Sequence, residues 1–266
     1  SSVSTLPSLT LDEVLIRAVK KSPKLSAFSR EVKAREFEAH QAGLHPNPEL
    51  SIEVENVAGS GESSGFDSAE TTAQISQLFE LGGKRARRLE VARLDRDLAE
   101  GEYEIARTEV LAEATESFVA VLAAQKRLIL AEDQLELNKK VLLTVEERIA
   151  AGKTASIEKT RFETVVAEAR LRRDRAQGEL NAARSTLATV WGSDVVDFAT
   201  VRGSLEEIQD MPEWSDLTSR LDDSPVAALQ RDASRRADRL LALERADRIP
   251  DLTFSLGLRN DQGSGN

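Results

Sequence analysis

Hydrophobic positions recur every seven residues through the middle of the chain. Between Lys84 and Ala150 there is no proline, and Gly101 is the only interior glycine. A continuous helix over this stretch would be roughly 100 Å long at a rise of ~1.5 Å per residue. Its main apolar row is Ala114, Val121, Leu128, Leu135, Leu142 and Ile149. Strict seven-residue spacing is typical of a coiled-coil seam rather than of a globular helix face.

A second helix with the same period follows a short turn. Gly152 lies in this turn and can adopt the left-handed conformation that ends a helix. The second apolar row is Phe162, Ala169, Ala176, Ala183 and Val190. Two such helices joined by a tight turn predict an antiparallel hairpin over 84–191. Because the return helix covers only roughly 55 Å, we expect a further helix, predicted at 24–45, to stack end to end with it against the long helix.

Apolar and polar residues alternate in three other segments, which predicts β-strands. The segments are 48–57, 70–80 and 250–258, and the first is followed by a Gly- and Ser-rich stretch at 58–69 that predicts a loop. About ten residues is the length that a tilted strand needs to cross a bilayer. A half-buried sheet in a soluble protein would show the same alternation, so the pattern alone does not choose between them.

The chain contains an internal repeat with an offset of 202 residues. Ser22-Pro23 matches Ser224-Pro225, and Pro48 and Leu50 match Pro250 and Leu252. A period this long indicates a duplicated structural unit. We predict a first repeat at 1–215, with a helix, two strands, the hairpin and a linker, and a truncated second repeat at 216–266, with a helix and one strand. A closed membrane barrel needs about eight strands or more, so several subunits would have to share one barrel.

Composition argues against several functions. The chain has 46 acidic and 36 basic residues, a net charge of -10 and no basic cluster, which makes nucleic acid an improbable partner. Cysteine is absent, so disulfides, thiolate metal sites and catalytic thiols are excluded. The only histidines, His40 and His45, lie five apart and do not share a helix face. We therefore expect no enzyme, no cofactor and no protein-bound metal site.

Several motifs resemble one family. The run SQLFELGGKR at 76–85 resembles the strand-to-helix junction of TolC-type outer-membrane efflux channels. Residues after the predicted turn carry the same resemblance, namely Arg148, Gly152, Glu163, Ala169, Leu180, Leu187 and Gly192. The run PNPEL at 46–50, followed by Glu55-Asn56 and Gly59-Ser60-Gly61, is similar to the branch that serves heavy-metal efflux pumps of the RND type. The chain is thus identified as an incomplete member of this family.

The resemblance implies a mainly α fold, in which a long antiparallel coiled-coil hairpin is joined to a few strands of an oligomeric outer-membrane β-barrel. It implies a homotrimer in outer-membrane lipid, with a helical tunnel in the periplasm of a Gram-negative cell. The implied partners are a periplasmic adaptor protein and an inner-membrane RND pump. The implied function is passive export of metal cations or other small molecules from the periplasm to the exterior.

The resemblance also points to candidate site residues. The predicted turn corresponds to the adaptor-contacting tip and consists of Ala151, Gly152, Lys153 and Thr154. Three acidic residues flank this tip, and in a symmetric trimer they could line the pore as rings that favour cations; they are Glu146, Glu147 and Glu158. The alternative function is a soluble periplasmic coiled-coil scaffold or adaptor, in which the strands would form a small capping sheet.

Overall fold

The computed structural model describes residues 6–55, 70–206 and 212–261. The chain forms two compact units, which we call the hairpin unit (residues 1–30 and 102–222) and the sheet unit (residues 31–101 and 223–266). Within the described ranges, no helix combines the length and the apolar character needed to cross a membrane. The loop predicted at 58–69 lies outside the described residues, as do Asn56 and Gly59-Ser60-Gly61.

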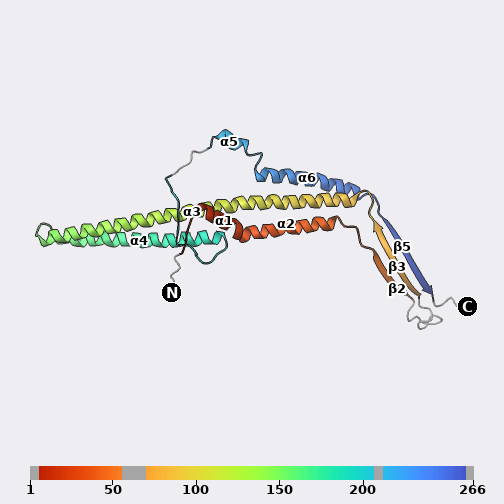
Figure 1. Ribbon diagram of the computed structural model, residues 1–266, viewed down its shortest axis with the longest axis horizontal. Helices are drawn as coiled ribbons and strands as arrows, with labels where there is room; N and C mark the ends of the chain where they lie inside the picture. The colour runs from red at the N-terminus through yellow and green to blue at the C-terminus, as the bar shows by residue number, and fades with distance from the viewer. Residues whose placement is uncertain (1–5, 56–69, 207–211, 262–266) are drawn as a thin grey trace. The chain divides into compact units, whose positions relative to one another are not determined.

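Two antiparallel helices are the main feature of the hairpin unit (Figure 1). Helix α3 (Lys84–Ala150) belongs to this unit from Glu102 onward, and α4 (Ile157–Val190) runs back along it. The predicted heptad rows face inward, with these positions buried: Ala114, Val121, Leu135, Ala169, Ala176 and Val190. The coiled-coil hairpin predicted from the sequence is therefore confirmed.

Helix α4 ends against the start of α2 (Pro23–Ala42) within the hairpin unit. Gly192 follows α4 in a left-handed conformation, with φ 72°. Its N–H donates to the Thr189 carbonyl at 2.9 Å, and the Ser193 N–H reaches back to the carbonyl of Ala188 at 3.1 Å, which completes a Schellman motif. A Cβ atom on Gly192 would lie 2.6 Å from the Pro23 ring. This contact confirms the predicted end-to-end arrangement at the point where the two helices meet.

A small mixed core completes the hairpin unit around α1 (Leu11–Lys21). Strand β1 (Ser8–Leu9) pairs in parallel with β4 (Thr200–Val201). The side-chain amide of Gln125 binds both backbone groups of Val201, at 3.0 Å and 2.7 Å. The largest fully buried side chains here are Phe198, Leu187, Val14, Val110 and Val121. The sequence did not predict this two-stranded sheet, because two-residue strands leave no alternation to detect.

The observed bounds of α2 differ from the predicted helix at 24–45. The helix begins at Pro23, since proline is well suited to the first helical position. It ends at Ala42. The N–H groups of Gly43 and Leu44 then donate to carbonyls three residues back, those of His40 and Gln41, each at 3.1 Å, as in a 3₁₀ turn. Pro46 also disfavours a helical conformation in the residue before it. A short helix, α5 (Trp214–Ser219), crosses the predicted boundary at 215 between the linker and the second repeat.

In the sheet unit, the first part of α3 contacts both α2 and α6 (Pro225–Ala246). On the α2 side, a Cβ on Gly43 would lie 3.5 Å from Leu89. On the α6 side, Arg239 forms an ion pair with Glu90 at 3.1 Å, and Arg236 forms one with Asp95. Figure 1 shows α3 running between the other two helices in this unit.

The two copies of the predicted repeat begin with the same local geometry. The Ser22 hydroxyl accepts the N–H of Leu25 at 3.5 Å, and the Ser224 hydroxyl accepts the N–H of Ala227 at 3.2 Å. In each copy a serine cap precedes a proline at the first helical position. In each copy the helix leads into a strand. The assignment of 1–215 and 216–266 as whole repeats stays a prediction.

Three strands form an antiparallel sheet in the order β2-β3-β5. The strands are β2 (Glu49–Glu55), β3 (Glu70–Phe79) and β5 (Leu252–Asp261). Strands β2 and β5 begin one and two residues after the predicted starts, after Pro48 and Pro250, which have no N–H to give to a sheet. Strand β5 extends beyond the predicted residue 258 because its last residues pair with the start of β3.

Candidate functional site

The predicted tip residues lie together at the turn between α3 and α4. Gly152 has φ 69°, and the N–H of Lys153 donates to the carbonyl of Arg148 at 2.8 Å. These features are those of a Schellman motif, which needs a residue that tolerates the left-handed conformation. Ala151, Gly152 and Lys153 are exposed, and Thr154 is half buried. The turn is therefore closed by backbone hydrogen bonds and leaves Ala151, Gly152 and Lys153 exposed.

The three acidic candidates near the tip differ in their environments. Glu146 pairs with Lys159 at 2.9 Å across the hairpin, and this hydrogen bond raises the pKa of Lys159. The Glu158 carboxylate lies 3.8 Å from the guanidinium of Arg161. The Glu147 side chain is exposed, and its carboxylate has no hydrogen bond or ion pair with any residue that the structure describes. Of the three, Glu147 keeps an unneutralised charge.

An open groove of about 460 Å³ lies on the hairpin beside the tip. It brings apolar side chains from both helices together with a few polar groups, and its lining consists of Val141, Thr144, Val145, Arg148, Thr154, Glu158 and Phe162. Sequence reasoning assigned Phe162 to the buried seam and did not predict a groove there. The sequence signal that could have indicated the groove was the size of the Phe162 side chain, because every other member of that row is alanine or valine.

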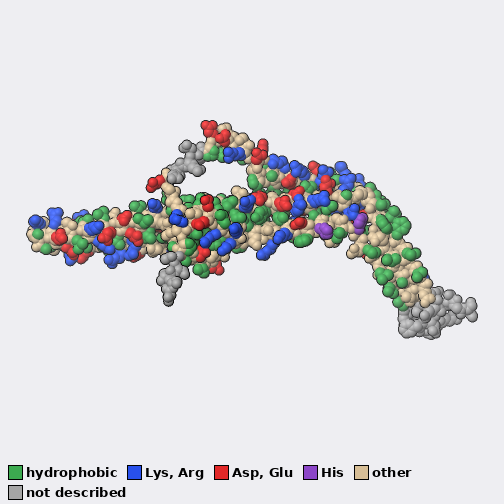
Figure 2. Space-filling model, viewed as in Figure 1, with side chains coloured by type: hydrophobic (Ala, Val, Ile, Leu, Met, Phe, Trp, Pro, Cys, Tyr) green, Lys and Arg blue, Asp and Glu red, His purple; other side chains and the backbone are tan. Residues whose placement is uncertain are grey.

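The β2-β3-β5 sheet has one continuous apolar face. The strand register sets Leu50 opposite Ile75, and Ile75 opposite Leu256. This face is open, with exposed fractions of 72 % for Leu50 and 76 % for Leu256. Its other large apolar members are also exposed, namely Ile52, Val54, Phe79, Leu252, Phe254 and Leu258. Figure 2 shows these apolar side chains gathered along the strands.

The opposite face of the sheet is mainly polar, although Leu78 also lies on it, opposite Thr253. Serine, threonine, glutamine and glutamate side chains alternate with the apolar ones, and Arg259 pairs with Glu70 across two strands. A sheet with one apolar and one polar face suits lipid on one side and water on the other. In the part of the chain that the structure describes, strands β2 and β5 each have a single neighbour in the sheet. Their outer edges therefore offer backbone groups to further strands.

Asp251 binds the turn that joins β3 to α3. Its carboxylate accepts the backbone N–H of Leu81 at 3.0 Å and the ammonium of Lys84 at 2.9 Å. These bonds, the backbone one first, hold the pKa of Asp251 below its usual range. Lys84 is buried at this contact. The turn is thus fixed to the start of β5.

The α2 side of the same turn has a second polar network. Arg88 binds the Glu80 carboxylate with two hydrogen bonds of 2.5 Å and 3.0 Å, and it donates to the Ala42 carbonyl at 3.1 Å. The Arg88 hydrogen bond lowers the pKa of Glu80, and the same bond raises the pKa of Arg88. Arg85 contacts the ring of His45. These partners compensate for basic residues at a helix N-terminus, where the helix dipole disfavours them.

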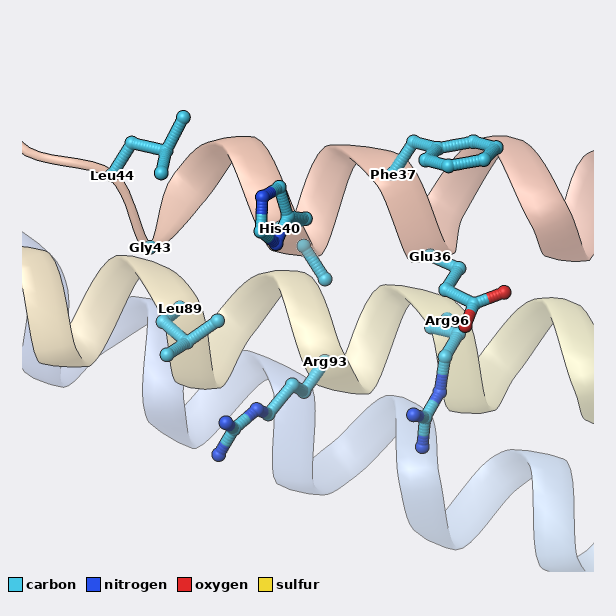
Figure 3. Close-up of a pocket in the computed structure, with 9 residues that line it drawn as sticks. Glu36, Phe37, His40, Gly43, Leu44, Leu89, Arg93 and Arg96 are labelled. Carbon is cyan, nitrogen blue, oxygen red and sulfur yellow. The ribbon is translucent and has the colours of Figure 1, made fainter.

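The two histidines do not lie in a common site. His40 is exposed and borders an open groove of about 680 Å³ between α2 and α3 (Figure 3). His45 instead contacts Arg85, next to the Arg88–Glu80 network described above. Among the described residues there is no group of three or more histidine, aspartate or glutamate side chains placed to hold a metal ion.

Sequence comparison gives one matching family and close relatives. The family described as "Outer membrane efflux protein" matches residues 14–193. The cobalt-zinc-cadmium resistance protein CzcC of Cupriavidus metallidurans is 34 % identical over 253 residues, which cover 95 % of this chain and 59 % of CzcC. The nickel-cobalt-cadmium resistance protein NccC of Alcaligenes xylosoxydans xylosoxydans is 27 % identical over 247 residues, covering 92 % and 55 %. The chain thus spans less than two thirds of the length of either relative.

Structural comparison indicates the same fold. The crystal structure of CusC, described in connection with transmembrane channel formation, matches with a TM-score of 0.77 at 17 % identity, covering 94 % of this chain and 59 % of CusC. The match extends over nearly all of the present chain. It confirms the TolC-like fold class predicted from the sequence.

Proposed function

Because this chain belongs to the outer membrane efflux protein family, we propose that it forms part of the wall of an export channel in the outer membrane. The observation that carries the proposal is the exposed apolar face of the β2-β3-β5 sheet. In water such a face would be unfavourable, because contiguous apolar patches of this kind are rare on soluble proteins. Lipid is the environment that removes this cost.

The free edges of the sheet require more strands. Three strands are present in the order β2-β3-β5, whereas membrane barrels close with about eight or more. The internal repeat supplies a reason to expect a fourth strand per full-length chain. Three chains would then contribute twelve strands, which is the homotrimer that the resemblance to TolC-type channels implies. A polar inner face and an apolar outer face would follow from the register.

The hairpin unit supplies the tunnel wall in this proposal. Its outer surface still carries exposed apolar side chains, including Leu130 at 67 % and Leu171 at 70 %. Neighbouring helices of the channel would cover them. The tip around Gly152 would contact a periplasmic adaptor, and an inner-membrane pump of the RND type would supply the energy. The duct itself acts passively.

The proposed cargo is divalent metal cations. Two relatives carry names that refer to resistance to cobalt, zinc, nickel or cadmium. A duct needs weak interactions with what it conducts, because tight binding would prevent release. The unneutralised Glu147 at the hairpin tip fits this requirement, since a ring of three such carboxylates attracts cations without forming a coordination site.

The test is metal resistance in cells that lack their own channel. They receive the full-length gene with its adaptor and pump, and resistance to zinc, cobalt, cadmium and nickel is measured. Restored resistance that disappears when any one component is omitted supports the duct and its cargo. Correct insertion without rescue would exclude metals as the cargo, and drugs or exported proteins would be tested next.

A soluble scaffold remains the competing function, and solubility separates the two. A channel subunit should sediment with the outer membrane and need detergent for extraction. A full-length protein found in the soluble periplasmic fraction would favour the scaffold. The exposed face formed by Leu50, Ile75 and Leu256 favours the channel.

A further inference from the structure

We propose that Glu49 is an inter-subunit contact residue, whose carboxylate binds the strand-to-helix turn of a neighbouring copy of the full-length chain. This inference rests on the proposed trimeric channel. The turn in question joins β3 to α3 in the sheet unit. It is contacted on one side by the segment after α2 and on the other by the segment after α6, in two different ways.

On the α6 side, the turn is recognised by an acidic residue. Asp251 accepts the Leu81 N–H at 3.0 Å and the Lys84 ammonium at 2.9 Å. The approach is close, because a Cβ on Gly82 would lie 2.7 Å from the Ile249 side chain, and Gly82 has φ 71°. The turn is therefore shaped to receive the segment that leads into the next strand.

On the α2 side, the contacts are made through backbone carbonyls. The Gln77 side chain donates to the Pro46 carbonyl at 2.9 Å, and Arg88 donates to the Ala42 carbonyl at 3.1 Å. The acidic residue of this flank, Glu49, does not reach the turn and instead lies opposite Ser76 in the sheet. The α6 flank thus binds the turn through a carboxylate, whereas the α2 flank binds it through backbone carbonyls.

The repeat makes Glu49 the counterpart of Asp251. Each is an acidic residue between a proline and a leucine, in Pro48-Glu49-Leu50 and Pro250-Asp251-Leu252. The Asp251 carboxylate binds the turn, whereas the Glu49 carboxylate is exposed and has no hydrogen bond or ion pair with the residues that the structure describes. Of these two equivalent carboxylates, that of Asp251 is hydrogen-bonded to the turn, and that of Glu49 has no partner among the described residues.

Strand pairing indicates what Glu49 meets. Strand β5 lies beside β3, and in this pairing Asp251 comes next to the turn after β3. Among the described residues, strand β2 has only β3 as a neighbour, so no described strand pairs with its other edge. In a closed ring of repeats, that edge pairs with the fourth strand of the adjacent chain, as β5 pairs with β3. Glu49 would then face the turn after that fourth strand.

The partner group is defined by the same comparison. By analogy with Leu81 and Lys84, we expect a backbone N–H and a cationic side chain in the turn that follows the fourth strand of the full-length chain. Glutamate is one methylene longer than aspartate and retains the two acceptor oxygens that this recognition needs. Bonds of this charge-assisted kind are stronger than neutral ones.

The experiment places a photo-reactive amino acid at position 49 or at position 251 of the full-length protein and irradiates outer membranes. We expect position 49 to give adducts at the mass of two chains, mapping to the turn beyond residue 266. We expect position 251 to give adducts at the mass of one chain, mapping to 81–84. Adducts from position 49 within its own chain, or none despite an intact trimer, would overturn the inference. Failure of the unmodified protein to form a trimer would overturn the proposed function itself.

A charge reversal gives an independent measurement. Glu49→Lys should lower the temperature at which the trimer dissociates in detergent, because it sets a cation against a cation. Glu53→Lys changes the same strand and the same face four residue pairs along and should lower that temperature less. Equal effects of the two variants would contradict a specific contact at Glu49.

Discussion

The ammonium of Lys84 lies 2.9 Å from the carboxylate of Asp251 and joins the first residue of α3 to the residue before β5. The same carboxylate accepts the N–H of Leu81. The contact therefore couples the end of one strand, the start of a helix and the start of another strand through a single side chain.

This relationship predicts a pH dependence of stability. The pKa of Asp251 is lowered in the folded chain, chiefly by the Leu81 N–H and then by Lys84. Its contribution is therefore complete above the unfolded pKa of about 4 and is lost as the pH falls through the lowered folded pKa. The difference in unfolding free energy between wild type and Asp251→Asn should be constant from pH 5 to 7 and should shrink below about pH 4. Asp232→Asn, which removes an exposed ion pair on α6, should have little effect at any pH.

Three glycine substitutions should separate conformational strain from steric overlap. Gly192→Ala should destabilise the chain by about 2 kcal/mol or more, because a left-handed alanine costs ~1–2 kcal/mol and its Cβ would also overlap Pro23. Gly152→Ala has the same backbone requirement but open space around it, so it should cost only the ~1–2 kcal/mol of the left-handed conformation. Denaturant midpoints of the purified variants measure both.

The matched control is Gly178→Ala on α4. A Cβ there meets nothing within 4 Å, and the backbone is helical. Alanine is the better helix former, so this variant should gain up to about 1 kcal/mol. Equal losses at positions 152 and 192 would mean that the close contact with Pro23 is not maintained in solution.

The lipid-facing assignment predicts opposite outcomes for adjacent residues of β5. Leu256→Arg puts a charge on the apolar face, where arginine near the bilayer midplane costs about 2–4 kcal/mol. The full-length variant should therefore insert poorly into the outer membrane, measured as the trimer fraction in that membrane. Ser255→Arg changes the polar face and should insert normally. Normal insertion of both variants would contradict a lipid-facing sheet.

The tip carboxylates predict a graded effect on ion selectivity. Glu147→Gln should reduce the preference for cations in single-channel recordings, since Glu147 has no counter-charge among the described residues. Glu146→Gln should have a smaller effect, because Lys159 already neutralises that carboxylate. Unchanged selectivity in both variants would remove these residues from the pore lining.

The sequence predicted the elements whose signal is long and regular. The heptad rows at Leu135 and Ala169 and the alternation around Ile75 and Leu256 each repeat several times, so periodicity alone predicted the hairpin and the strand faces correctly. Helix ends were less accurate, as at Ala42, because local bonds after the helix decide where it stops.

Contacts between distant segments could not be read from the pattern. The amide of Gln125 on Val201 and the ion pair between Lys84 and Asp251 each join residues far apart along the chain. Nothing in the local sequence around these residues indicates a partner. The tip residues around Gly152 were predicted from the resemblance, and their role as an adaptor contact stays a prediction.

The pairing of β5 with β3 has a consequence for the order of folding. Leu81 and Asp251 are 170 residues apart, so their association must close a long loop, whereas the hairpin forms through contacts between neighbouring segments. Local contacts form sooner, and the entropy of loop closure delays distant ones. The hairpin should therefore fold before the sheet is complete. During that interval the free edge of β3 is exposed, which makes this the stage most prone to aggregation and the one at which a chaperone would act.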